Sequence, residues 1–152
     1  MPQIGEKVPD FALMNQDGEQ VRLSDFHGHK VVLFAFPKAG TPGCTTQACG
    51  FRDAFPQIEI ANATVLGLSP DQPADLLKWK QKESLPYTLL SDPDHKVLEA
   101  MGAWGERSMY GKKYMGVIRS HWIIDEEGTL VDAQIKVSPT DSVARAVEFL
   151  GA

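Results

Sequence analysis

The chain contains little cysteine: only Cys44 and Cys49 occur among its 152 residues. Small secreted domains that depend on disulfides usually carry more cysteines, and a chain of this length does not need them for stability. Two cysteines five residues apart therefore indicate redox or metal chemistry before structural cross-linking. A zinc site needs four ligands, and the four histidines show no finger-like spacing, so we expect neither a metal nor another cofactor.

Long apolar runs and an excess of positive charge are also missing. The longest apolar run, Val31–Phe36, is far shorter than the roughly 20 residues of a membrane span. The chain has 15 basic and 20 acidic residues, a net charge of -5, so neither a nucleic acid nor an anionic membrane is an expected partner. The segment Met1–Lys7 has no apolar stretch of the secretory type, which leads us to expect a cytoplasmic protein.

What the sequence does contain is typical of one globular domain. Hydrophobic residues make up 43% and charged residues 23% of the chain, with no repeat, low-complexity tract or linker. A chain of this length can bury a substantial core. We therefore expect a single domain over residues 1–152.

The order of the expected elements indicates an α/β fold. They are a hairpin at 11–23, a strand at 31–36, a helix from about 41–44 to 55 that Pro56 bends or ends, a strand at 64–69, a helix at 73–83, a strand at 87–91, a helix at 96–101, an irregular segment at 103–116, a hairpin of strands 117–124 and 130–135, and a last helix capped by Asp141. Alternating strands and helices predict a central mixed sheet covered by helices, with the first hairpin as an N-terminal extension of a thioredoxin-like plan. The apolar strand at 31–36 should be buried on both faces.

The loop from Pro37 to Cys44 is the segment best suited to chemistry. Cys44 follows a proline- and glycine-rich turn and lies near the start of a helix, where free N–H groups and the helix dipole favour a thiolate. Gly43 leaves room for a small molecule, and the Thr41 hydroxyl can donate and accept hydrogen bonds beside the sulfur. A thiolate that attacks a peroxide becomes a sulfenic acid.

Cys49 is placed to capture such an oxidised sulfur, but helical geometry sets a condition. Residues i and i+5 of an ideal helix have Cα atoms roughly 8.5–9 Å apart, whereas a disulfide requires about 4.4–6.8 Å. If Cys44 and Cys49 lie on one intact helix, its first turns must unwind before the two sulfurs can bond. Gly50, directly after Cys49, would ease this change.

The residues alone leave other interpretations open. Both cysteines could be small buried hydrophobic residues. The chain could be a thiol–disulfide oxidoreductase, although the usual sign is a Cys-x-x-Cys spacing, or a non-enzymatic binding or redox-regulated chaperone module. A phosphate-binding loop is disfavoured because the glycine-rich segment lacks the Gly-Lys-Ser/Thr element.

A resemblance to a known family favours one of these interpretations. The stretch Phe36-Pro-Lys-Ala-Gly-Thr-Pro-Gly-Cys-Thr-Thr-Gln-Ala-Cys-Gly-Phe-Arg-Asp53 resembles the active-site signature of the peroxiredoxins, and more narrowly the bacterioferritin comigratory protein, or peroxiredoxin Q, subfamily. The segments Gly5–Phe11 and Val117–Asp125 resemble the family's first residues and its late strand, so the similarity covers nearly the whole chain.

The resemblance implies a role for five residues. Cys44 matches the peroxidatic cysteine, Thr41 the hydroxyl that binds the peroxide, and Pro37 the proline that shields the sulfur from water. Arg119 matches the arginine that holds thiolate and peroxide, and Cys49 matches the resolving cysteine of members that form an intramolecular disulfide. Together with Gly43, Thr41 and Arg119 would bind the substrate.

The resemblance further implies a thiol peroxidase that acts on hydrogen peroxide and organic hydroperoxides. Its disulfide would be reduced by thioredoxin or a similar dithiol protein, and the chain would be a monomer.

Three positions depart from the subfamily pattern. Gly40 stands where an aspartate is common, and Gln47 stands where a glutamate is common. Both changes remove negative charge near Cys44, which should favour its thiolate. His121 occupies the place of a small hydroxyl residue. In an extended strand it shares a face with Arg119, so it would either be structural or touch the site.

Overall fold

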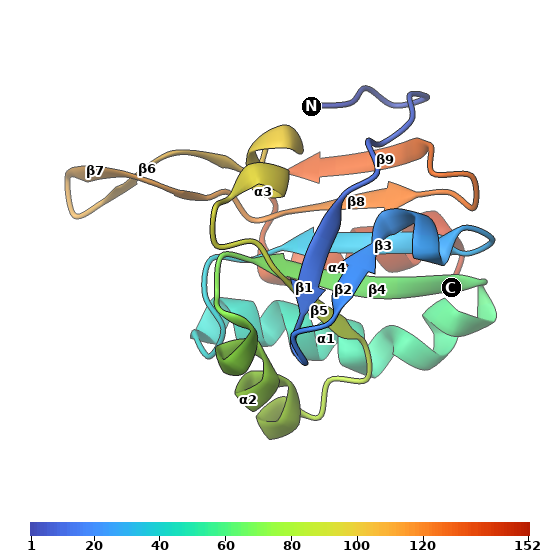
Figure 1. Cartoon of the computed structure of the whole chain (residues 1–152), viewed down its shortest axis with the longest axis horizontal. Coiled ribbons are helices and arrows are strands. Elements are labelled where there is room, and N and C mark those ends of the chain that lie inside the picture. The colour runs from blue at the N-terminus through green and yellow to red at the C-terminus, as the bar shows by residue number, and fades with distance from the viewer.

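The computed structural model describes residues 1–152, and Figure 1 shows a central sheet with helices on both of its faces. In chain order the elements are β1 (Ala12–Asn15), β2 (Gln20–Arg22), the 3-10 helix η1 (Leu23–Phe26), β3 (Lys30–Ala35), α1 (Pro42–Ile60), β4 (Ala63–Ser69), α2 (Pro73–Glu83), β5 (Thr88–Ser91), α3 (Lys96–Ala100), β6 (Trp104–Met109), β7 (Lys112–Val117), β8 (Ser120–Ile124), β9 (Leu130–Ile135) and α4 (Pro139–Leu150).

The main sheet is mixed, as the sequence predicts. Its seven strands follow the order β2-β1-β5-β4-β3-β8-β9. The strands β3, β4 and β5 are parallel, while β1, β8 and β9 join antiparallel to their neighbours. The thioredoxin-like plan with an N-terminal hairpin is thereby confirmed.

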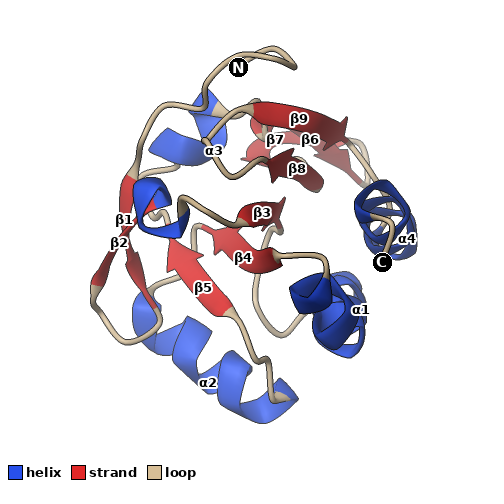
Figure 2. Ribbon diagram, turned by 90° about the vertical axis from the view of Figure 1, so that its right-hand side faces the viewer, coloured by secondary structure: helices blue, strands red, loops and turns tan.

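Both faces of the sheet are buried, which explains the continuous apolar run of β3. Val32 and Phe34 pack with residues of α1, α2 and α4, whereas Val31 and Leu33 pack with residues of α3 and of the N-terminal segment. Figure 2 shows α3 on the opposite side of the sheet from α1 and α4. Because side chains alternate along a strand, only a run that is apolar throughout satisfies both layers. None of the helices is both long and apolar enough to cross a membrane.

The expectation of an irregular segment at 103–116 is wrong. Residues 104–117 form the hairpin β6–β7, which projects from the body of the molecule (Figure 1). Tyr110 and Gly111 form its turn with φ angles of 52° and 77°, the positive values that a type I′ turn requires. The hairpin is largely exposed on both faces, so its sequence lacks the apolar alternation that marks a half-buried strand.

Two predicted helix boundaries are also wrong. The helix α1 continues through Pro56 to Ile60, and Ile58 beyond the proline is fully buried. Burial of Ile58 offsets much of the hydrogen bond that proline removes, since each effect amounts to roughly 2–3 kcal/mol. The cap of α4 is Ser138 rather than Asp141, because the Ser138 side chain accepts from the Asp141 N–H and Pro139 occupies the first helical position.

The contact between α1 and α4 depends on Gly50. A Cβ at this position would lie 2.7 Å from Cγ2 of Val143. We predict that Gly50→Ala lowers the free energy of unfolding by about 1 kcal/mol, because overpacking costs roughly 1–3 kcal/mol and the helical preference of alanine returns about 1 kcal/mol.

The matched control is the same substitution in a Val143→Ala background. There the clash is absent, and Gly50→Ala should raise stability in urea denaturation. Equal effects in both backgrounds would show that the two side chains do not meet.

Candidate active site

Cys44 lies at the end of the sheet where the parallel strands finish. The chain leaves β3, turns through residues 36–41 and enters α1 with Thr41 as the N-cap and Pro42 as the first helical residue. Cys44 is thus in the first turn of α1, as the sequence predicts, and its side chain is completely buried. The positive end of the helix dipole acts on its sulfur.

Strand pairing brings Arg119 to this cysteine across 75 positions of sequence. Ala35, the last residue of β3, lies opposite Ser120, the first residue of β8, so Arg119 lies beside the start of the active-site loop. Its Nη2 atom is 3.5 Å from Sγ of Cys44 and donates to it. A guanidinium in this position attracts negative charge that develops at the sulfur, because opposite charges interact strongly where water is excluded.

Gly43 makes this contact possible. A Cβ on Gly43 would lie 3.1 Å from Nη2 of Arg119 and 3.7 Å from Cγ of Pro139. The sequence predicts that the missing side chain leaves space for a small molecule. In the structure that space admits the guanidinium.

The loop residues Thr41 and Pro37 also border the site. The Thr41 hydroxyl donates to the carbonyl of Lys38 at 2.7 Å rather than to the sulfur. With its proton committed in this way, the hydroxyl oxygen remains free to accept a hydrogen bond.

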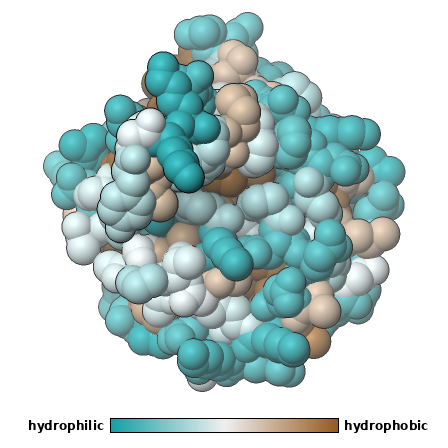
Figure 3. Space-filling view, turned by 90° about the vertical axis from the view of Figure 1, so that its left-hand side faces the viewer, coloured by the Kyte–Doolittle hydropathy of each residue, from teal (hydrophilic) through white to brown (hydrophobic).

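Pro37 and Arg119 line a cavity of about 820 Å³, and Arg119 connects this cavity with the sulfur of Cys44. The hairpin β6–β7 supplies one wall, including Met109 and Tyr114, and residues 136–138 supply another. Figure 3, which faces this end of the molecule, shows hydrophobic atoms set below an outer layer that is mainly hydrophilic. The cavity has the size of a site for a small organic molecule.

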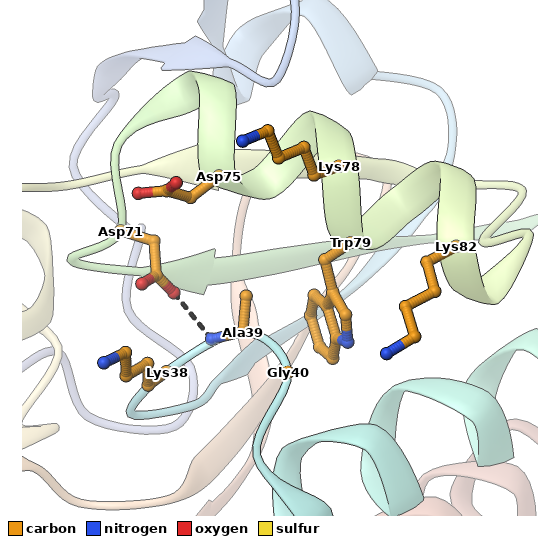
Figure 4. Close-up of a pocket in the computed structure, with 8 residues that line it drawn as sticks. All are labelled: Lys38, Ala39, Gly40, Asp71, Asp75, Lys78, Trp79 and Lys82. Carbon is orange, nitrogen blue, oxygen red and sulfur yellow. Dashed lines mark hydrogen bonds between the residues drawn. The ribbon is translucent and has the colours of Figure 1, made fainter.

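Asp71 anchors the loop from the other side, a contact that the sequence did not reveal. Its carboxylate accepts from the Ala39 N–H at 2.8 Å and from the Ser69 hydroxyl at 2.8 Å. Figure 4 shows this bond at the base of a second cavity of about 430 Å³, which separates the loop from Lys78 and Lys82 of α2. No local sequence pattern identifies Asp71, because it follows the end of β4 and reaches the loop after β3 only through the pairing of these two strands.

Cys49 lies on the same helix as Cys44, and both are free thiols. Its Sγ donates to Oε2 of Glu83 at 3.5 Å, and Arg52 donates from Nη1 to the Glu83 carbonyl at 2.7 Å. Burial raises the pKa of the Cys49 thiol, the Arg52 charge opposes this, and Glu83 raises it further. Cys49 is therefore held as a thiol in this conformation, and Arg52 lies beside Cys49 rather than Cys44.

Gln47 and His121 lie behind the site. Oε1 of Gln47 accepts from Nη1 of Arg119 at 2.8 Å, and its Nε2 donates to the Ser142 hydroxyl at 3.0 Å. His121 is fully buried and touches Ser142 rather than Cys44 or Arg119. Burial lowers its pKa to about 4. The sequence predicts either a structural histidine or a residue that touches the site. In the structure His121 is connected to Arg119 through Ser142 and Gln47.

The fold and this buried cysteine facing an arginine define a class of thioredoxin-like proteins with a reactive thiol. The family model described as AhpC/TSA family matches residues 4–133. Peroxiredoxin Bcp of Bacillus subtilis is 44% identical over 97% of this chain and 94% of its own, and peroxiredoxin Bcp of Escherichia coli K12 is 49% identical over 83% and 81%.

A solved structure supports the same family. The bacterioferritin comigratory protein of Xanthomonas campestris, described by its alkyl peroxide reduction activity, superposes with a TM-score of 0.87. It is 30% identical over 93% of this chain and 90% of that one. The chain belongs to the AhpC/TSA family and is a peroxiredoxin of the bacterioferritin comigratory protein, or peroxiredoxin Q, type. It is therefore a peroxidase, which decides against the thiol–disulfide oxidoreductase and the non-enzymatic module as its primary activity.

The surroundings of Cys49 predict that replacing Glu83 and replacing Arg52 by an uncharged residue change the reactivity of its thiol in opposite directions. Glu83→Gln removes the carboxylate that raises the pKa of Cys49, so the thiol should ionise at lower pH and be alkylated several-fold faster at neutral pH. Arg52→Gln removes the charge that lowers the pKa and should slow alkylation.

Both rates are measured with iodoacetamide on reduced, folded protein in a Cys44→Ser background, where Cys49 is the only thiol. A change in the same direction for both variants would show that they act by opening the helix and not by charge.

Proposed function

We propose that Cys44 reduces peroxides as the peroxidatic cysteine and that Cys49 resolves the product as an intramolecular disulfide. The observation that carries this proposal is the 3.5 Å contact between Nη2 of Arg119 and the buried sulfur of Cys44 at the start of α1. Peroxidase activity follows from the family, whereas the roles of these residues are the proposal.

In the first step the Cys44 thiolate attacks the terminal oxygen of a hydroperoxide. The sulfur–oxygen bond forms, the oxygen–oxygen bond breaks, and the leaving alkoxide takes a proton to become an alcohol, or water when the substrate is hydrogen peroxide. Arg119 donates to the oxygens on which charge develops, and the Thr41 oxygen accepts from the peroxide O–H. Pro37 limits the access of water to the sulfur, and Gly43 lets the guanidinium approach.

In the second step Cys49 attacks the sulfenic acid, and a disulfide and water are formed. Both residues lie on α1, and residues five apart on a helix are too distant for a disulfide. The first turns must therefore unwind, which also exposes Cys49 and takes it away from Glu83, so the pKa of its thiol, raised by burial and then by this carboxylate, falls. A dithiol protein such as thioredoxin then reduces the disulfide by thiol exchange.

The cavity of about 820 Å³ beside Arg119 supports organic hydroperoxides as substrates in addition to hydrogen peroxide. Hydrogen peroxide needs only the immediate surroundings of the sulfur. The hydrophobic side chains on the wall can contact the organic part of a larger substrate. The alkyl peroxide reduction activity of the Xanthomonas relative agrees with this choice.

The remaining expectations concern the chain as a whole. We propose that residues 1–152 act as one domain, as a monomer, in the cytoplasm. The site supports the first point, because residues as far apart as Cys44 and Arg119 meet in it.

Substitution of either cysteine tests the mechanism. Cys44→Ser should lose peroxide consumption in the presence of a thioredoxin system, because serine cannot form the thiolate. Cys49→Ser should retain one rapid turnover and accumulate a sulfenic acid on Cys44, but cycle poorly.

Peroxide consumption and mass spectrometry of the intact protein measure these outcomes. The proposal fails if wild-type protein and Cys44→Ser consume peroxide at the same rate. Absence of a Cys44–Cys49 bond after one equivalent of peroxide contradicts the resolving role alone.

The cavity wall predicts a change of substrate preference. Tyr114→Ala should raise KM for cumene hydroperoxide several-fold, because contact area with the organic group is lost. The KM for hydrogen peroxide should not change.

Tyr110→Ala is the matched control, since Tyr110 is on the same hairpin but is 98% exposed and does not line the cavity. Equal effects of Tyr110→Ala and Tyr114→Ala, or an equal change for both peroxides, would contradict the assigned binding surface.

A further inference from the structure

A continuous row of polar side chains leads from Cys44 into the core between α1, α4 and β8. Nη2 of Arg119 is 3.5 Å from Sγ of Cys44, and Nη1 is 2.8 Å from Oε1 of Gln47. Nε2 of Gln47 is 3.0 Å from Oγ of Ser142, which lies 2.7 Å from Nδ1 of His121. Gln47, Ser142 and His121 are completely buried, so solvent does not compete for the bonds among these three residues.

The chemistry of the groups fixes the direction of the bonds from Arg119 through Gln47 to Ser142. A guanidinium only donates, so the Gln47 amide must turn its oxygen to Arg119 and its NH₂ to Ser142. The Ser142 oxygen then accepts from Gln47, and its own proton is free for the neighbour on its other side. Nδ1 of a neutral imidazole can accept that proton, whereas an imidazolium could not.

The surroundings of His121 favour this acceptor form. Burial lowers the pKa of His121 to about 4, the nearby Asp132 carboxylate opposes the shift, and Arg145 adds to it. The imidazole is therefore neutral at neutral pH. Nε2 faces Oδ2 of Asp132 at 3.8 Å, so the negative carboxylate favours the tautomer with the proton on Nε2 and the lone pair on Nδ1.

We propose that Ser142 and His121 are positioning residues of the peroxidase site, which act through Gln47 to hold the Arg119 guanidinium against the Cys44 sulfur. The amide of Gln47 has an accepting and a donating end, and the Ser142 hydroxyl, itself bonded to His121, holds the donating end so that the accepting end stays on Arg119. A reversed amide would present N–H groups to a guanidinium, and the two donors would repel each other. The proposal rests on the proposed role of Cys44.

Two departures from the subfamily pattern meet in this row. A glutamate at position 47 would accept from Arg119 through either oxygen and would need no orienting partner. The neutral Gln47 needs one, and His121, which stands where a small hydroxyl residue is usual, supplies it through Ser142. The pair thus keeps an acceptor for Arg119 without a negative charge near the thiolate.

The test measures the Cys44 thiolate directly, in a Cys49→Ser background where Cys44 is the only thiol. Its ultraviolet absorbance gives the thiolate fraction at neutral pH, and stopped-flow mixing with hydrogen peroxide gives the rate of the first step. Ser142→Ala and Gln47→Met should each lower the rate on the order of tenfold, because the first loosens and the second removes the hydrogen bond between Gln47 and the charged Arg119. Both should also lower the thiolate fraction.

A double-mutant cycle shows whether the effect passes through Arg119. Arg119→Met should reduce both quantities, and Ser142→Ala should cause no further loss in that background. Gln16→Met is the matched control, since it removes a buried amide that accepts from Leu89 N–H far from the site. It should lower thermal stability but leave thiolate and rate unchanged.

Two results would overturn the inference. One is an unchanged thiolate fraction and rate in folded Ser142→Ala and Gln47→Met. The other is an equal loss from Ser142→Ala with and without Arg119. The absorbance does not depend on turnover, so a failure of the proposed function would appear separately, as a wild-type thiolate that does not react with peroxide.

Discussion

The site depends on one contact, the Arg119 guanidinium against the buried sulfur of Cys44. The sulfur is shielded from water, so a charge on it requires compensation from the protein. The start of α1 supplies part of this, and Arg119 supplies a full opposite charge. Pairing of β3 with β8 sets the position of Arg119, and the absence of a side chain at Gly43 lets the guanidinium approach. The same strand pairing that builds the central sheet therefore also positions the arginine of the site.

The two cysteines have opposite electrostatic surroundings. Cys44 faces a guanidinium, whereas Cys49 donates to the Glu83 carboxylate and its pKa is raised, mainly by burial. The folded helix thus places a guanidinium beside one sulfur and holds the other as a protonated thiol. Under the proposed mechanism, α1 unwinds only after the first step. Until then Cys49 stays a protonated thiol and does not compete with Cys44 for the peroxide.

Much of the fold could be predicted because local patterns carry it. The bounds of α2 agree with the prediction at both ends, and β3 stands out because burial on both faces demands an apolar run. The hairpin β6–β7 was missed because both of its faces are exposed. The end of α1 was misplaced because burial of Ile58, a tertiary effect, offsets the cost of Pro56.

The sequence by itself determined the class of fold, the reactive loop and the position of Cys44 near a helix start, since each depends on neighbouring residues. Arg119 was identified only by resemblance, because nothing local distinguishes it from a surface arginine of a strand. The tertiary structure alone decided the partners of these groups: Asp71 on the loop, Glu83 on Cys49, and Ser142 between Gln47 and His121. These contacts join residues 21 to 95 positions apart, and only the packing of the sheet and its helices brings such residues within hydrogen-bonding distance.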